Sequence, residues 1–329
     1  MTTNADTRRV LTDTDSFIFP VDVSRRAATG PQPVLPRLRP DQVARGLATF
    51  ESELVLACAA WDDEAEAEAM TVLRAPVARS TTDAVLGPLA THDRDRVAEL
   101  VLAWVDSLGP VIAADRPPAR WSRVRRAERR ARQGLEGALA DLHVERPPVA
   151  AVELAAGVQV PIAAGAWLLV LLAEHPEAAA LARDHGLAAE VVWEVLRLRP
   201  PTWVSARMTT RDVTVGAGRV PAHAVVLVSP LLLGLDDAHV PPGTSHPEEF
   251  DPARWCGTDV RPGAWLPFGA GPHACPGRSL GLAQLTALAR WALGRRVTLV
   301  TPARIDQTRG IFPSPARLRC LPGPSPVEE

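Results

Sequence analysis

The sequence predicts an α-rich α+β fold, in which long helices come first and short strands follow. Up to residue 198, apolar residues recur at the spacing of one helix face. After Pro200-Pro201 they occur in short β-rich runs around glycines. A doubly wound sheet would instead alternate strands and helices along the whole chain. Hydrophobic residues make up 47% of the 329 residues, enough for a large core, and we expect a single domain over residues 1–329.

Three amphipathic segments open the predicted helical half. They cover Arg39–Trp61, Ala65–Leu86 and Arg94–Leu108. Pro40, just before Asp41, is typical of a helix start. The acidic run Asp62–Glu68 and the arginine-rich run Arg120–Arg132 are interpreted as solvated faces or helix ends. The arginine run is the one candidate docking patch for an acidic partner, although Glu128 interrupts it.

A twenty-residue segment, Leu154–Ala173, is apolar enough to raise the question of a membrane span. Pro161 lies inside it, and Glu153 and Glu174 flank it where membrane helices carry basic residues. Gln159 is its one polar residue. We therefore expect a fully buried core helix and no membrane span.

Shorter elements complete the predicted fold. A helix over Glu177–Leu198 should stop at Pro200-Pro201. The other expected elements are a hairpin of Asp212–Val215 and Val220–Ser229, an irregular proline-rich stretch at Pro241–Pro267, a helix at Arg278–Leu293, and strands at Arg296–Val300 and Arg317–Leu321.

Charge and cysteine usage exclude several classes of protein. The 36 basic and 38 acidic residues give a net charge of −2, so no overall field attracts nucleic acid or an anionic membrane. The chain contains no lysine, which suggests a GC-rich bacterial genome. Its four cysteines show no CxxC pair or disulfide spacing, and the first ten residues lack the apolar core of a signal peptide. We expect a reduced, cytoplasmic protein.

The segment FGAGPHACPG, Phe268–Gly277, carries the strongest chemical signal. It is a glycine-rich turn that presents one thiol, Cys275, just before a helix, whose N-terminal N–H groups lower the pKa of a thiol. The glycines let the backbone approach a flat, bulky group. His273 is too close to Cys275 for paired zinc ligation. A thiolate ligand to haem iron fits better than zinc, a protease nucleophile or an inert buried cysteine.

This segment resembles the haem-binding loop of the cytochrome P-450 family, F-x-x-G-x-[H/R]-x-C-x-G. The resemblance implies haem b (iron protoporphyrin IX), with Cys275 as the iron ligand. It assigns cofactor contacts to the loop residues Phe268, Gly269, Gly271, His273 and Gly277. Arg207, just after Ser205-Ala206, resembles the arginine that meets a haem propionate, a charge-assisted pairing.

Two further segments resemble the same family and occur in its order. Glu194-Val195-Leu196-Arg197 resembles its E-x-x-R motif, and Pro252-Ala253-Arg254-Trp255 resembles its P-x-R-[F/W] motif. An isolated i,i+3 pair is usually a surface salt bridge. The resemblance instead implies that Glu194, Arg197 and Arg254 form a buried charge cluster, which would cost about 3–5 kcal/mol to break.

The apolar helix departs from the family's A-G-x-[D/E]-T-[T/S] pattern. The corresponding residues are Ala156-Gly157-Val158-Gln159-Val160-Pro161, and we assign Gly157, Gln159, Val160 and Pro161 to the catalytic region. Gln159 and Val160 cannot deliver a proton at neutral pH. Pro161 removes a helix hydrogen bond and predicts a kink above the haem. Gln159 also lacks the charge with which the family's fatty-acid peroxygenases hold a carboxylate.

Residues 1–40 resemble a shortened version of the family's N-terminal β/helix region. The stretch from Leu11 to Pro20 resembles the segment before the family's B–C region. The usual helix C motif that grips a propionate is not found. Arginines near the expected position are Arg25, Arg26, Arg37 and Arg39. We expect a wider distal mouth, or a surface that a protein partner or a second copy covers.

The resemblance implies a haem-thiolate oxidoreductase, of monooxygenase or peroxygenase type, acting on a small, largely apolar molecule in a bacterial secondary-metabolite pathway. Electrons would come from a ferredoxin and its reductase, or peroxide would replace them. Ile311 and Phe312 would line the substrate pocket. The alternatives are a haem-thiolate isomerase, dehydratase or bond-forming enzyme that does not cleave dioxygen, and a non-catalytic homologue that stabilises a partner.

Overall fold

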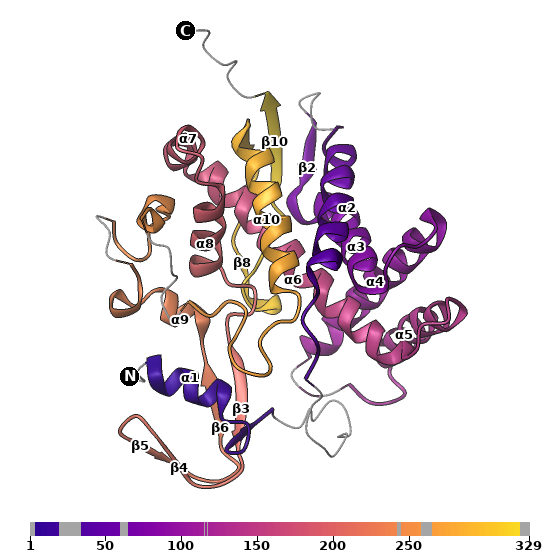
Figure 1. Cartoon of the computed structure of the whole chain (residues 1–329), viewed down its shortest axis with the longest axis vertical. Helices are drawn as coiled ribbons and strands as arrows, with labels where there is room; N and C mark the ends of the chain where they lie inside the picture. The colour runs from indigo at the N-terminus through magenta and orange to yellow at the C-terminus, as the bar shows by residue number, and fades with distance from the viewer. Residues whose placement is uncertain are drawn as a thin grey trace.

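The computed structural model describes residues 4–19, 34–59, 65–114, 116, 118–241, 245–257 and 265–322 (Figure 1). Its helices in these ranges are α1 (Asn4–Thr12), α2 (Pro40–Ala59), α3 (Ala69–Leu86), α4 (Thr91–Ile112), α5 (Arg123–Asp141), α6 (Pro147–Glu174), α7 (Pro176–Asp184), α8 (Ala188–Leu198), α9 (Pro230–Gly234) and α10 (Arg278–Leu293). Single 3-10 turns cover Asp237–His239, Pro252–Trp255 and Gln307–Arg309.

The described strands form small antiparallel sheets. One sheet has the order β1-β3-β6 and joins β1 (Phe17–Ile18), β3 (Ser205–Thr209) and β6 (Val225–Val228). A second has the order β2-β10-β7 and joins β2 (Glu66–Glu68), β10 (Arg317–Pro322) and β7 (Arg295–Leu299). Two hairpins pair β4 (Val213–Val215) with β5 (Gly218–Val220) and β8 (Ile305–Asp306) with β9 (Phe312–Pro313). Many helices with small sheets confirm the predicted α-rich α+β class.

Helix α6 runs through the main hydrophobic core. From Ile162 to Leu172 its residues are all buried, and it packs against α3, α4, α5, α8, α10 and β7. Among the described residues, α6 is the one helix long and apolar enough to cross a membrane, but 72% of its most apolar window is buried within the protein. The predicted core helix is thus confirmed, with an earlier start at Pro147, where the missing proline N–H costs nothing.

Two predicted helix boundaries are wrong, one because of pairing with a distant strand and one because of a break at a glycine. The helix predicted from Ala65 begins at Ala69, because residues 66–68 pair with β10 and the Glu68 carboxylate caps the N–H groups of Met70 and Thr71. The helix predicted over residues 177–198 is two helices, α7 and α8. The break contains Gly186 in the left-handed region, with φ of +66°.

The predicted hairpin is also only partly correct. Its tight turn forms around Gly216, at φ +58°, but joins β4 to β5 alone. Residues 225–228 form β6 and pair with β3 in a different sheet. Helix α5, which begins in the arginine-rich run, the short helices α1 and α9, and the strands β1, β3, β8 and β9 were not predicted. The helices predicted from Arg39, Arg94 and Arg278 are confirmed as α2, α4 and α10, with ends shifted by a few residues; Trp61 lies outside the described part of the chain.

Candidate functional site

The cysteine loop, residues Phe268–Gly277, is a compact turn directly before α10. The Cys275 N–H donates to the carbonyl of Phe268 over 2.9 Å, which closes the loop. Gly269 and Gly271 adopt φ values of +65° and +74°, which side chains disfavour. A Cβ on Gly271 would lie 2.7 Å from a carbonyl oxygen of α1, whereas one on Gly269 would meet nothing within 4 Å. One glycine therefore serves close packing and the other keeps a surface of the loop bare.

Cys275 reaches solvent but is surrounded by enough protein to be poorly hydrated. Its side chain is exposed, yet burial raises the pKa of the Cys275 thiol. The Gly277 N–H and the Arg278 guanidinium act in the opposite direction and are outweighed. The expectation that the helix start alone lowers this pKa is therefore wrong for the chain by itself. A positively charged partner at the sulfur would be needed to favour the thiolate.

Arg207, Phe19 and His273 meet beside the cysteine loop. The Arg207 guanidinium carbon lies 3.9 Å from the centre of the Phe19 ring, and the His273 ring meets Phe19 edge-on at 4.9 Å. Arg207 is 4% exposed and donates to the Ser205 hydroxyl and the Ala206 carbonyl, both at 2.9 Å. Burial lowers the pKa of Arg207, and burial together with Arg207 lowers the pKa of His273. No described carboxylate compensates this buried cation.

Glu194, Arg197 and Arg254 lie together in a closed, buried cluster. The Glu194 carboxylate accepts two bonds from Arg197, at 2.6 and 2.8 Å, and one from Arg254 at 3.2 Å. The indole of Trp255 and the backbone N–H of Asp251 also donate to it, at 2.9 and 3.0 Å. The two arginines also donate hydrogen bonds to backbone carbonyls and a serine hydroxyl. The hydrogen-bonding capacity of the Glu194 carboxylate is thus filled, and these carbonyls and the hydroxyl solvate the one excess positive charge of the two guanidinium groups.

A series of aromatic rings connects the cluster to the cysteine loop. Trp193 meets Trp255 at 5.7 Å, Trp255 meets Trp265 at 6.4 Å, and Trp265 meets Phe268 at 6.1 Å between ring centres. The Trp265 indole also donates to the Trp193 carbonyl. These contacts fix the cysteine loop relative to α8. Sequence reasoning missed Trp193 and Trp265, because nothing in the local pattern distinguishes them from ordinary core residues.

The four residues assigned to the catalytic region lie on the less buried side of α6. Gly157, Gln159, Val160 and Pro161 are all half-buried, whereas Val158 between them is fully buried. The Gln159 side chain has no hydrogen-bond partner among the described residues. Helix α6 continues through Pro161 without a break.

Thr81 of α3 supplies a hydrogen bond that Pro161 cannot. In a regular helix the N–H of residue 161 would donate to the carbonyl of Gly157, but proline has no N–H. The hydroxyl of Thr81 donates to that carbonyl over 3.3 Å. A Cβ on Gly157 would lie 2.8 Å from the Thr81 methyl group, so only glycine permits this approach. The sequence shows that Pro161 leaves the Gly157 carbonyl without its helical donor, but it does not show that Thr81 provides another donor.

Of the two residues assigned to the substrate pocket, Ile311 lies in the turn after the 3-10 segment and Phe312 is the first residue of β9. The Ile311 side chain is buried, and its carbonyl accepts a 2.7 Å bond from the Trp167 indole of α6. Phe312 is half-buried against the main core. A Cβ on the neighbouring Gly310 would lie 2.9 Å from the Trp203 indole nitrogen. Their role toward a substrate stays a prediction.

The arginines considered for a second propionate contact divide into two groups. Arg25 and Arg26 lie outside the described residues, whereas Arg37 and Arg39 are exposed. Arg39 pairs with Asp41 at 3.1 Å. Between them, the Leu38 N–H donates to the carbonyl of Pro276, so this segment lies against the cysteine loop.

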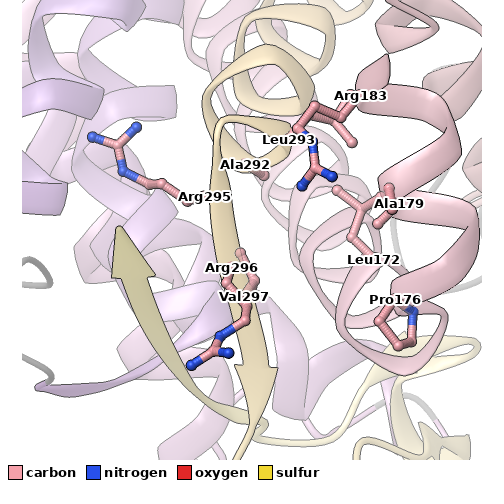
Figure 2. Close-up of a pocket in the computed structure, with 10 residues that line it drawn as sticks. Leu172, Pro176, Ala179, Arg183, Ala292, Leu293, Arg295, Arg296 and Val297 are labelled. Carbon is pink, nitrogen blue, oxygen red and sulfur yellow. The ribbon is translucent and has the colours of Figure 1, made fainter. Parts of the chain in front are cut away.

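A separate hollow of about 450 Å³ lies between α7, the end of α10 and β7 (Figure 2). Its floor is apolar, and Arg183, Arg295 and Arg296 are among its lining residues. Arg183 pairs with Asp184, and Arg295 stacks on Trp291. None of the predicted site residues lines it.

Comparison with curated proteins finds sequence relatives with known reactions. A family model described as cytochrome P-450 matches residues 186–297. A cyclooctat-9-en-7-ol 5-monooxygenase from Streptomyces melanosporofaciens is 40% identical over 111 residues, which cover 31% of this chain and 23% of that protein. A cyclooctatin synthase from the same organism is 32% identical over 193 residues, covering 52% and 41%. The matched segments thus span less than half of these relatives.

Solved structures match the fold over nearly the whole chain. CYP175A1 from Thermus thermophilus superposes with a TM-score of 0.75 at 21% identity, covering 97% of this chain and 88% of that one. The open cytochrome P-450 EryK from S. erythraea superposes with a TM-score of 0.74 at 20% identity, covering 100% and 91%. The structures show the fold, and the sequence match falls on the segment that holds the charge cluster and the cysteine loop. The chain therefore has the fold of these cytochrome P-450 structures, and its residues 186–297 match the cytochrome P-450 family model.

Proposed function

We propose that this protein is a haem-thiolate oxidoreductase that oxidises a small, largely apolar molecule in bacterial secondary metabolism. The observation that carries the proposal is the juxtaposition of two groups at the cysteine loop. One is the bare-faced turn that presents Cys275, and the other is the buried, uncompensated guanidinium of Arg207. A ligand with a metal for the thiol and a carboxylate for the guanidinium satisfies both.

Proteins of the cytochrome P-450 family bind haem b, iron protoporphyrin IX. The residues present fit this group. Burying a cation without an anion is costly, and Arg207 has only neutral hydrogen-bond acceptors among the described residues. A haem propionate would provide the missing charge through a charge-assisted bond. No described residue lies within 4 Å of the position that a Cβ on Gly269 would take, which fits the close approach of a flat ring.

When bound, haem supplies an iron centre that can oxidise a substrate held above it. Cys275 would ligate the iron through its thiolate. The positive charge of iron would offset the burial that raises the pKa of the free thiol. Arg207 and His273 would orient the propionate edge, with Phe19 packed between them. The cluster around Glu194 would hold the segment that carries the loop.

The substrate side is formed by a helix surface that cannot donate a proton from a side-chain acid. Gln159 replaces the acid and Val160 the alcohol of the family pattern, and neither titrates near neutral pH. Any proton needed in the reaction would come from a substrate hydroxyl or a bound water. An apolar substrate that carries at least one hydroxyl group therefore suits this surface best. An alcohol with an apolar carbon skeleton is such a molecule, and one relative is named for its action on cyclooctat-9-en-7-ol.

The lack of an acid at position 159 and of an alcohol at position 160 also favours a second function, a haem-thiolate reaction without dioxygen cleavage. Val158, Val160 and Pro161 carry no proton donor, which suits an isomerisation, a dehydration or a bond-forming reaction at the iron. The two proposals differ in what the reaction consumes. Oxidation needs dioxygen with electrons, for example from a ferredoxin and its reductase, or peroxide. The second function needs neither.

The first experiment tests Cys275 as the ligand. The haem-loaded protein should give the thiolate signature in its ferrous–carbon monoxide spectrum, and Cys275→Ser should abolish it. Cys256→Ser is the matched control, because Cys256 is also an exposed cysteine. An unchanged spectrum in Cys275→Ser would exclude Cys275 as the ligand. Failure to bind haem at all would favour a non-catalytic homologue.

The second experiment tests the reaction. Cyclooctat-9-en-7-ol and other alcohols with apolar carbon skeletons should be incubated with dioxygen and a ferredoxin system, with peroxide, and anaerobically with neither. Oxidised product in either of the first two arms supports the leading proposal. Full product yield in the anaerobic arm overturns it in favour of the second function.

A further inference from the structure

The segment from Arg116 to Arg132, at the turn between α4 and α5 and along α5, concentrates positive charge. It contains eight arginines and a single acidic residue, Glu128, a net charge of +7 in a chain whose overall charge is −2. In Figure 1, α4 and α5 lie side by side at one edge of the molecule, opposite α7. The positive charge is therefore concentrated in one region, although the net charge of the whole chain is slightly negative.

The outer face of α5 carries a stripe of arginines without acidic partners. Arg123, Arg126 and Arg130 are exposed and follow the i, i+3, i+7 spacing of one helix face. None of them pairs with a described carboxylate. Glu128 points the other way: it is 8% exposed and accepts from the Trp104 indole of α4 over 3.2 Å. The one acid in the segment therefore cannot neutralise the stripe.

Two large apolar side chains flank the turn between these helices. Ile112, at the end of α4, is 77% exposed, and Trp121, just before α5, is 71% exposed. The Arg120 guanidinium lies 5.4 Å from the Trp121 ring centre. Single exposed apolar residues are common. An exposed isoleucine and an exposed tryptophan at the two ends of the connection between α4 and α5, beside a stripe of arginines, fit the composition of a membrane-surface element.

We propose that the α4–α5 turn and the outer face of α5 bind the surface of a bilayer that contains anionic lipid. The arginines would contact lipid phosphates, with their aliphatic stems along the surface. Ile112 and Trp121 would enter the boundary between headgroups and acyl chains, where tryptophan is favoured. An acidic protein would account for the arginines but would leave both apolar side chains without a counterpart. The attachment is peripheral, because α6 is buried in the core.

The test is flotation of the haem-loaded full chain with vesicles of phosphatidylcholine alone or with phosphatidylglycerol. Binding should require the anionic lipid and weaken with added salt. One surface arginine contributes about 1 kcal/mol to such binding, or about a fivefold change in partition coefficient. The triple variant Arg123→Gln, Arg126→Gln, Arg130→Gln should therefore partition about 100-fold more weakly. Trp121→Ala should weaken binding with the charge unchanged.

A matched control removes the same charge elsewhere. Arg8, Arg290 and Arg296 are also exposed and have no described acidic partner; their triple glutamine variant should bind almost as the parent does. All variants should keep the haem spectrum of the parent, which shows that they are folded. Equal losses in the two triple variants would overturn the proposal. So would binding to polyglutamate without binding to anionic vesicles, which would assign the stripe to an acidic protein.

Discussion

The hydrogen bond from Thr81 to Gly157 gives the most specific prediction about the helix that covers the proposed active site. Thr81→Val keeps the shape of the side chain and removes its hydroxyl. The carbonyl of Gly157 is then left without a donor, because residue 161 is a proline. Leaving a buried carbonyl unsatisfied costs about 1–3 kcal/mol. Thr81 is 2% exposed, but Gly157 is half-buried and the bond is long at 3.3 Å, so we expect about 1 kcal/mol.

The prediction becomes sharper in the background of Pro161→Ala. Alanine restores an N–H that can donate to the carbonyl of Gly157 within α6. In that background Thr81→Val should therefore cost little. The two substitutions should show a coupling energy of about 1 kcal/mol in a double-mutant cycle, well above the roughly 0.3–0.5 kcal/mol scatter of independent sites. Free energies of unfolding of the haem-loaded protein in urea provide the measurement.

Thr82→Val is the matched control. Thr82 is fully buried on the same helix, and its hydroxyl donates to the carbonyl of Ala78 in α3 itself. That carbonyl has no connection with Pro161, so Thr82→Val should cost the same in both backgrounds. If Thr81→Val costs the same with proline and with alanine at position 161, the Thr81 hydroxyl does not replace the missing N–H of Pro161, and the prediction is refuted.

The remaining predictions concern the charge cluster and the first half of α6. Glu194→Ala leaves the buried guanidinium groups of Arg197 and Arg254 without a counter-ion and should cost about 3–5 kcal/mol, seen as insoluble or haem-free protein; soluble protein with a normal haem spectrum would contradict this. Burial raises the pKa of Glu153, so its ionisation costs stability as the pH rises through that pKa. Glu153→Gln should therefore raise Tm at neutral pH more than below the pKa of the carboxyl, and an equal rise at both would be inconsistent with this. Gln159→Asp with Val160→Thr should improve the ratio of product to electrons consumed for substrates without a hydroxyl; no improvement would show that proton supply is not limiting.

The parts of the site that the sequence predicted are those held by short, local patterns. The cysteine loop is set by glycines in left-handed conformations and by a bond from Cys275 to Phe268, all within one turn. The uniform hydrophobicity of Leu154–Ala173 predicts the core helix α6. Glu194 and Arg197 are one helical turn apart, so their pairing also follows from local geometry.

The parts that sequence reasoning missed depend on partners far along the chain. Residues 66–68 continue a helical pattern, yet they form β2 because β10, near the other end of the chain, pairs with them. Thr81 is an ordinary helix residue until α3 packs against α6 at Gly157. Phe19 has no local signal for its position between Arg207 and His273. Such contacts follow from tertiary packing, which overrides local propensity.

The way the chain treats its buried charges separates structural groups from groups suited to a ligand. Glu194 is fully buried, but five hydrogen bonds satisfy it and two guanidinium groups more than offset its charge. Because its hydrogen-bonding capacity is filled within the protein, the Glu194 carboxylate is not available to a ligand. We therefore assign it a structural role. Arg207 is almost as deeply buried, yet it meets only a hydroxyl, a carbonyl and an aromatic ring. A buried cation without a counter-ion lowers the stability of the fold. A carboxylate of the bound cofactor would remove this cost. We therefore expect that cofactor binding raises the free energy of unfolding mainly through its contact with Arg207.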